Sequence, residues 1–349
     1  MGQFPIRKKN NYPTQARKLV WGTLQVSFIV AQLNLVSVIA VNRPSHHLAQ
    51  YGAPAIAREM AISHSDFRLF LPCPDPGPGK RYNLRAAGNR GLVRELKVRL
   101  LILSDIHSNL EALEACLNAV DGWDQFVNLG DTVGYGADPN AVIERVRPYG
   151  GLSVRGNHDR AVLDPKEIET FNPIAAAAVQ WTRNSLTPEN LAWLSEVPVG
   201  PVYEPALADT QFVHGSPGNE DEYILSEFSA RTAFADSRAQ LIFFGHTHIQ
   251  GAVEYKENNI QVIHPSYAFK PGSAERCDFP LEDETRYLLN PGSVGQPRDG
   301  DWRAAFATYD SAKHQVSFWR APYDVDLAQQ KIIGAGLPYR LASRLREGR

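Results

Sequence analysis

The sequence predicts an α/β fold with two β-sheets, on two observations in residues 98–349. First, apolar runs that end in polar clusters alternate with helix-like segments. Asp105, Asp131 and Asn157 follow three of these runs and lie 26 residues apart, which is the length of a strand–helix repeat that sets consecutive strands side by side. Second, the later part of the region offers strand after strand with turn signals between them, which suggests antiparallel pairing and a second sheet.

The individual elements follow from these patterns in chain order. Apolar, β-branched runs predict strands at 98–105, 124–131, 151–159, 210–215 and 240–248. Between the first three strands, the apolar spacing predicts helices over 109–120 and 139–150. Further strands are expected at 250–257, 260–265, 285–290, 303–310 and 315–322. Residues 266–284 have no apolar period and are expected to form an insertion loop.

Residues 1–97 differ in composition from the rest of the chain. Residues 1–99 contain fifteen Lys and Arg against four Asp and Glu, whereas residues 100–349 contain twenty-one against thirty-four. The formal charges are therefore +11 and −13. The acidic body argues against a nucleic-acid groove, because duplex binding needs a basic surface.

The N-terminal part contains a run that could span a membrane. Residues 19–41 are twenty-three uncharged residues behind a basic flank, as in a membrane-spanning or signal helix. Six polar side chains interrupt this run, and no clear cleavage site follows it. Residues 43–94 are rich in Pro, Gly and Arg, which is typical of loop or disorder. We expect residues 1–97 to be an irregular, disordered extension or a gene-model artefact, with the true start near Val98, and residues 98–349 to form one domain.

The cysteines indicate a reducing environment. Cys73, Cys116 and Cys277 are far apart and odd in number, and none forms a C-x-x-C pair. They predict neither a disulfide framework nor a thiolate metal site. A cytoplasmic location is therefore expected.

Each of the five earlier predicted strands ends with side chains that are able to bind a metal ion. They are Asp105, His107, Asp131, Asn157, His158, His214, His246 and His248. Five of the seven histidines in residues 98–349 belong to this set. A single histidine at a strand end is more often structural. Five such clusters in order instead predict a ligand site, because these sites form at the carboxyl ends of strands in open α/β sheets.

The residue types indicate which ions such a site would hold. Carboxylate, imidazole and amide groups without a thiolate suit Mn²⁺, which we expect, with Fe, Zn²⁺, Ni²⁺, Mg²⁺ or Co²⁺ as alternatives. There are enough ligands for two ions, and Asp131 could bridge them. A pair of ions lowers the pKa of a bridging water, which makes hydroxide available near neutral pH, and clamps two oxygens of a phosphate.

Several motifs resemble those of a known family. "SDIHSN", "NLGDTVGYG", "RGNHD", "VHGSP" and "FGHTH" resemble the five motifs of the calcineurin-like metallophosphoesterase superfamily. "LLNPGSVGQPRDGD" and "RAPYDVDLAQQKIIGAGLP" resemble its bacterial and archaeal cytoplasmic branch. The resemblance covers about residues 98–345 and none of residues 1–97. It implies a two-sheet β-sandwich flanked by α-helices, with the site at the strand ends on one edge.

The resemblance also implies a role for each residue of the set. One metal would be held by Asp105, His107, Asp131 and His248. The other would be held by Asp131, Asn157, His214 and His246. His158 would contact the substrate phosphate and protonate the leaving oxygen, for which a positioned imidazole is suited.

One position departs from the pattern of the protein Ser/Thr phosphatases in this superfamily. Those enzymes have an aspartate three residues after the bridging one, which orients the catalytic histidine, and here that position is Gly134. Asp159 follows His158 directly, but neighbouring side chains on an extended segment point apart, so it need not replace that partner. A Ser/Thr phosphatase assignment is therefore in doubt.

Two arginines are candidate substrate-binding residues. Arg155 precedes "GNHD" as in those phosphatases, and a structural ion pair is the alternative. Arg298 lies on a Gly-rich loop after a predicted strand and could contact phosphate through its planar fork, with loop stabilisation as the alternative. Tyr135 and Tyr223 could border the cleft.

Together these observations predict a dinuclear metal-dependent hydrolase of a small phosphomonoester or phosphodiester. One alternative is a non-catalytic interaction module, such as the retromer scaffold subunit, which resembles this fold but has lost the catalytic histidine. The presence of His158 argues against it. A nuclease is a second alternative, opposed by the acidic body and by the lack of a basic, aromatic stripe. A membrane-anchored enzyme is expected only if residues 19–41 span a bilayer. The sequence predicts no oligomeric state.

Overall fold

The computed structural model describes residues 97–270 and 272–349, together with 19–21, 24–27 and 39–40. The chain divides into two units, Met1–Ala87 and Gly88–Arg349. In the first unit, the described residues form three short antiparallel strands, β1 (Leu19–Trp21), β2 (Leu24–Ser27) and β3 (Ile39–Ala40). The rest of the predicted extension, including most of the candidate membrane run, lies outside the described residues. Within the described part of the chain, no helix has the length and apolarity needed to cross a membrane.

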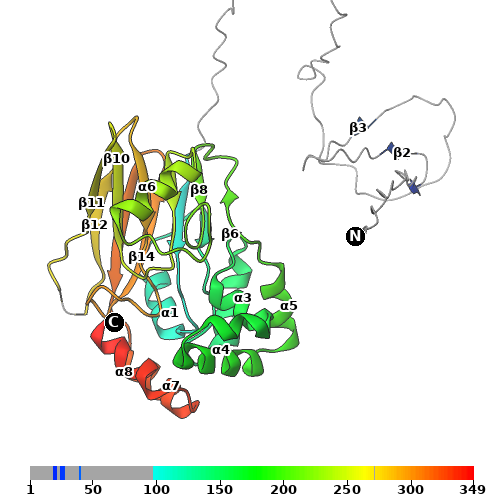
Figure 1. Cartoon of the computed structure of the whole chain (residues 1–349), viewed down its shortest axis with the longest axis vertical. Helices are drawn as coiled ribbons and strands as arrows, with labels where there is room; N and C mark the ends of the chain where they lie inside the picture. Colours follow the sequence, from blue (N-terminus) through cyan, green and yellow to red (C-terminus); the bar gives the residue numbers. More distant parts are fainter. Residues whose placement is uncertain (1–18, 22–23, 28–38, 41–96, 271) are drawn as a thin grey trace, which may run out of the picture. The chain divides into compact units, whose positions relative to one another are not determined.

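Two six-stranded sheets form the second unit (Figure 1). In order across the first sheet, the strands are β12 (Glu275–Pro280), β15 (Gln315–Ala321), β14 (Ala304–Asp310), β4 (Arg99–Leu103), β5 (Gln125–Asn128) and β6 (Leu152–Ser153). The strands of the second sheet are β11 (Asn259–Ile263), β10 (Gly251–Lys256), β13 (Arg286–Asn290), β9 (Leu241–Phe243), β8 (Thr210–Phe212) and β7 (Val202–Tyr203).

The alternation of side chains along the strands makes these sheets a sandwich. Leu100 and Ile102 of β4 pack in a core with Phe243 of β9 on the other sheet. Leu101 and Leu103, which point to the opposite face, pack against α1. This period of two buries both faces of the central strands. The predicted two-sheet α/β sandwich flanked by helices is therefore confirmed.

Helices cover both outer faces of the sandwich. The first sheet is covered by α1 (Leu110–Asn118) and α2 (Pro139–Val146), which continues into the 3₁₀ turn η1 (Arg147–Tyr149). The second sheet is covered by α6 (Glu227–Asp236). A further group packs together, made of α3 (Asn157–Leu163), η2 (Pro165–Thr170), α4 (Pro173–Ser185) and α5 (Pro188–Glu196). At the C-terminal end, α7 (Val325–Gly334) pairs with α8 (Tyr339–Glu347).

The strand pairing confirms one expectation and corrects two. As predicted, β4, β5 and β6 lie side by side and parallel. The later strands do not form a sheet of their own: β10, β11 and β13 join one sheet and β12, β14 and β15 the other, so both sheets are mixed. The predicted loop 266–284 contains β12, which pairs with β15 at a sheet edge. Because an edge strand buries little, its sequence lacks the apolar signal of a central strand.

Candidate metal centre

The backbone turns sharply where the central strands end. Asp105, Asp131 and His246 follow β4, β5 and β9 and have φ angles of 51°, 52° and 63°. This left-handed conformation costs residues other than glycine roughly 1–2 kcal/mol each. It is held by cross-strand hydrogen bonds, such as Asp105 N to Gly130 O at 2.9 Å. Strained residues of this kind gather at functional sites.

Four side chains from three of these turns meet in a first cluster. Their potential ligand atoms lie within 4.8 Å of one another, and the residues are Asp105, His107, Asp131 and His248. His248 Nε2 lies 3.2 Å from Asp105 Oδ1, and His107 Nε2 lies 3.6 Å from Asp131 Oδ2. All four are buried. The family resemblance noted in the sequence implies the same four residues as ligands of one metal.

A second cluster shares Asp131 with the first. It contains Asp131, His214 and His246, again with ligand atoms within 4.8 Å. His214 Nε2 is 3.6 Å from Asp131 Oδ2 and 3.2 Å from Asn157 Oδ1. Asn157 thus reaches the same group as predicted. The Asp131 carboxylate therefore belongs to both clusters of potential metal ligands.

Hydrogen bonds to backbone carbonyls fix which nitrogen of each histidine can bind a cation. Nδ1 donates to Val133 O in His107, to Leu129 O in His214 and to Gln296 O in His248, at 3.2, 2.8 and 2.6 Å. Because a carbonyl oxygen only accepts, Nδ1 holds the proton and the Nε2 lone pair faces the cluster. His246 donates from Nε2 to Asp221 O instead, at 3.2 Å, which leaves its Nδ1. Such second hydrogen bonds are typical of metal-binding histidines.

The electrostatics of the two clusters suit divalent cations. Burial raises the pKa of Asp131 to about 8, opposed by His214 and reinforced by Asp105. Burial also lowers the pKa of His107 well below its usual range and that of His246 to about 3, so these imidazoles are neutral. Asp105 Oδ1 is buried without a hydrogen-bond partner. Buried carboxylates, neutral imidazoles and an unpartnered oxygen are the donors that a divalent cation stabilises, so the residues present fit two such ions.

His158 lies beside the clusters but is held differently. Its backbone N–H donates to Asp131 Oδ1 at 2.8 Å. Its ring is enclosed by those of Tyr135, His107 and Phe171, with centroids 4.3, 4.8 and 4.9 Å away. A Cβ at Gly134 would lie 2.6 Å from His158 Nδ1, and that nitrogen is buried without a hydrogen-bond partner. This imidazole is therefore oriented by aromatic packing. No carboxylate of the described residues forms a hydrogen bond with it.

Asp159 corrects one step of the sequence analysis. The segment after β6 is not extended, because α3 begins at Asn157. Asp159 Oδ2 accepts from Gly156 N and its Oδ1 from Val133 N, both at 3.1 Å. It ties the start of α3 to the turn that carries Asp131. The expectation that Asp159 need not orient His158 agrees with these bonds, although the reason is a helix start rather than a strand.

Comparisons with known proteins agree with this geometry. Residues 98–250 match the family model of the calcineurin-like phosphoesterases. The crystal structure of a metallophosphoesterase from Sphaerobacter thermophilus is 36% identical, with a TM-score of 0.61 over 72% of this chain and 100% of that one. The chain belongs to the calcineurin-like metallophosphoesterase superfamily.

Two further similarities involve proteins of unassigned function. An uncharacterized protein of Methanocaldococcus jannaschii is 36% identical over 260 residues, which are 73% of this metallophosphoesterase and 100% of the relative. A hypothetical protein from Pyrococcus horikoshii OT3 shares the fold, at 20% identity and a TM-score of 0.57 over 72% of this chain and 99% of that one.

The two candidate substrate-binding arginines of this metallophosphoesterase occupy different places. Arg155 Nη2 donates to Ser195 O and Val197 O at 2.7 and 2.6 Å, so it binds the end of α5 and forms no ion pair among the described residues. Arg298 N donates to His248 O at 3.1 Å. After burial, the charge of Arg298 is the largest influence that lowers the pKa of both His158 and His248. Arg298 therefore faces the metal centre.

Three aromatic residues pack against the histidines of the metal centre and against His158. Tyr223 stacks on His246 with centroids 3.9 Å apart, and Tyr135 contacts both His107 and His158. The sequence analysis suggested both tyrosines as border residues. It missed Phe171, which follows η2 in a segment with no strand signal to mark it.

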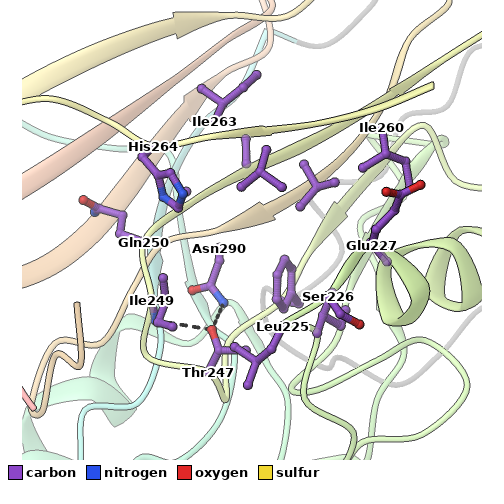
Figure 2. Close-up of a pocket in the computed structure, with 17 residues that line it drawn as sticks. Leu225, Ser226, Glu227, Thr247, Ile249, Gln250, Ile260, Ile263, His264 and Asn290 are labelled. Atoms are coloured by element: carbon purple, nitrogen blue, oxygen red, sulfur yellow. Dashed lines mark hydrogen bonds between the residues drawn. The ribbon is translucent and has the colours of Figure 1, made fainter.

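An apolar pocket of about 270 Å³ adjoins the loop of residues 246–248, which follows β9 (Figure 2). Thr247, which stands between two of the histidines, faces this pocket and accepts a hydrogen bond from Asn290 Nδ2 at 2.9 Å. The remaining labelled lining residues are Leu225, Ser226, Glu227, Ile249, Gln250, Ile260, Ile263 and His264. None of the clustered ligands lines the pocket, so the loop separates the two.

Proposed function

We propose that the protein hydrolyses small phosphate esters with two divalent cations, of which Mn²⁺ is the first candidate. The observation that supports this most strongly is the pair of buried clusters that share Asp131. In this proposal Asp105, His107, Asp131 and His248 hold one ion, and Asp131, Asn157, His214 and His246 hold the other. When bound, such a pair activates water near neutral pH and polarises the phosphate.

The chain's own residues would supply the remaining chemistry. His158 Nδ1 is enclosed beside Gly134 without a hydrogen-bond partner, which leaves Nε2 to give a proton to the leaving oxygen. Arg298, whose charge reaches His158 and His248, would contact the phosphate through its planar fork. Arg155 has its guanidinium bound to carbonyls of α5, so we propose a structural role for it.

Removal and return of metal tests this function. We expect the full chain to lose hydrolysis of p-nitrophenyl phosphate or bis-p-nitrophenyl phosphate after chelation. Separate addition of Mn²⁺, Mg²⁺, Ni²⁺ and Zn²⁺ should restore it, with Mn²⁺ among the active ions. The ratio of the two rates distinguishes monoester from diester preference. Folded protein that binds metal but hydrolyses neither ester with any ion would contradict the proposal and favour an interaction module.

We also propose that residues 98–349 form one domain in a reducing, cytoplasmic setting. The relatives align over their full lengths with 72–73% of this chain, a share that residues 98–349 can account for. Cys116 and Cys277 are both free thiols. A chain that begins at Val98 should keep the metal content and melting temperature of the full chain. A melting temperature lowered by more than a few degrees would show that residues 1–97 contribute to the fold.

A further inference from the structure

Arg298, beside the metal centre, and Arg344, on α8, have no acidic partner among the described residues. Other half-buried or buried arginines of the described residues are held by carboxylates, as Arg303 is by Asp301 and Glu275, or by backbone carbonyls, as Arg286 is. By contrast, Arg298 and Arg344 form no ion pair within the described part of the chain, and each keeps guanidinium nitrogens without a hydrogen-bond partner there. Half-buried guanidinium groups without a counter-charge are costly, because burial removes water from the charge.

Arg298 is fixed in place but not saturated. Its backbone N–H donates to His248 O, and its Nη2 donates to Gln296 Oε1 at 3.2 Å. Its Nε is buried without a hydrogen-bond partner. Burial raises the pKa of Tyr223, which stacks on His246, and the nearby charge of Arg298 opposes this rise. The Arg298 guanidinium therefore keeps N–H donors that no described residue uses.

Arg344 is brought close to Arg298 by the C-terminal helix. Leu341 and Leu345 of α8 pack in one core with Tyr135, the residue that contacts His158. The end of α8 is tied to the loop that carries Arg298, because Gly300 N donates to Gly348 O at 2.9 Å. Arg344 uses its Nε to bind Arg349 O. Its two terminal nitrogens have no hydrogen-bond partner among the described residues.

The two charges act on each other. Burial lowers the pKa of Arg344, and the charge of Arg298 is the next cause. Tyr135 and Glu347 oppose this shift, and Arg340 adds to it. Glu347 forms no ion pair with Arg344, although it lies on the same helix. A bound anion would relieve the repulsion between the two arginines and use their unpaired donors.

We propose that Arg298 and Arg344 form a second anion subsite, which binds a second phosphate group of the substrate beside the metal centre. This inference rests on the proposed phosphoesterase function and deepens it. The reacting phosphate would lie between the metal clusters and His158, and Arg298 would donate both to it and to the second phosphate group. Arg344, on α8, would bind the second phosphoryl group of the same molecule. The substrate class is then a diphosphate or bisphosphate rather than a simple monophosphate.

The test compares matched ligands on the Mn²⁺-loaded full chain, freed of excess metal. We compare fructose 6-phosphate with fructose 1,6-bisphosphate, and AMP with ADP. The affinity of each ligand is measured from its inhibition of p-nitrophenyl phosphate hydrolysis and by calorimetry. In at least one pair, we expect the ligand with two phosphates to bind about tenfold more tightly, which corresponds to about 1.4 kcal/mol. Arg344→Gln should reduce this ratio to near one.

Arg346→Gln is the matched control, because it removes the same charge from the same helix where Arg346 pairs with Asp326. It should keep the ratio. If Arg344→Gln destabilises the fold, Arg344→Lys, which retains the charge, should keep part of the preference. Equal ratios in the unmodified chain and the Arg344 variant overturn the subsite. Calorimetry still reports the ratio if p-nitrophenyl phosphate is not hydrolysed, so failure of the proposed function is distinguished from failure of the subsite.

Discussion

Asp131→Asn should abolish both bound metal and phosphoesterase activity while leaving the fold intact. Asp131 Oδ2 lies 3.6 Å from His107 Nε2 and 3.6 Å from His214 Nε2, so one oxygen faces both clusters. Asparagine removes the negative charge that both cations would share. Its amide oxygen can still accept the 2.8 Å hydrogen bond from His158 N. We therefore expect loss of ions from both sites rather than from one.

The fold should survive because the replaced carboxylate is costly where it stands. Burial raises the pKa of Asp131 to about 8, whereas an amide carries no charge to desolvate. Metal content by elemental analysis, turnover and melting temperature are measured together. Asp310→Asn serves as control, since Asp310 stands opposite Arg99 in the β14–β4 register, at the other end of β4 from Asp105, and its carboxylate pairs with Lys313. Two ions per chain and normal turnover in Asp131→Asn would rule out the shared carboxylate.

The candidate metal ligands could be found in the sequence because most of them stand where an apolar strand ends. Asp105 and Asp131 end neighbouring parallel strands, and parallel strands place their carboxyl ends at the same edge. Which candidates would share one metal was implied by the family resemblance and not by the order of the strands. His248 joins the same group from the other sheet, because the sandwich brings the end of β9 beside the end of β4.

The pairing of the later strands could not be predicted in the same way. A hairpin pattern such as that of β10 and β11 is local, but it does not state which sheet the hairpin joins. The sequence of β12 does not predict a strand, because β12 lies at a sheet edge with alternate residues exposed. The start of α3 was also missed, although Asp159 three residues after Gly156 is the usual acidic signal of a helix N-terminus.

The surroundings of His158 depend on contacts between distant segments. Phe171 follows η2, and Tyr135, which packs on the His158 ring, shares a core with Leu341 of the last helix, more than 180 residues from His158 along the chain. No motif spacing links such positions, because loops and helix packing bring them together. Only the structure explains why glycine occupies position 134. A Cβ there would lie 2.6 Å from His158 Nδ1.

His158→Ala should keep the bound metal but lose about 10²–10⁴-fold in turnover. None of the contacts between cluster side chains involves the His158 imidazole, and the backbone bond from residue 158 to Asp131 remains in alanine. Loss of a proton donor matters most when the leaving oxygen is basic. The defect should therefore be smallest for p-nitrophenyl phosphate, larger for phenyl phosphate and largest for an alkyl phosphate.

This dependence on the leaving group separates a general acid from a packing role. If His158 only supported Tyr135 and Phe171, its removal would slow every ester by the same factor. His314→Ala, which removes an imidazole near the β14–β15 turn at the other end of the sheet, should change neither metal content nor turnover. Full activity of His158→Ala on alkyl phosphates would exclude it as the acid. An unchanged metal content with a graded loss of rate would assign the proton to His158.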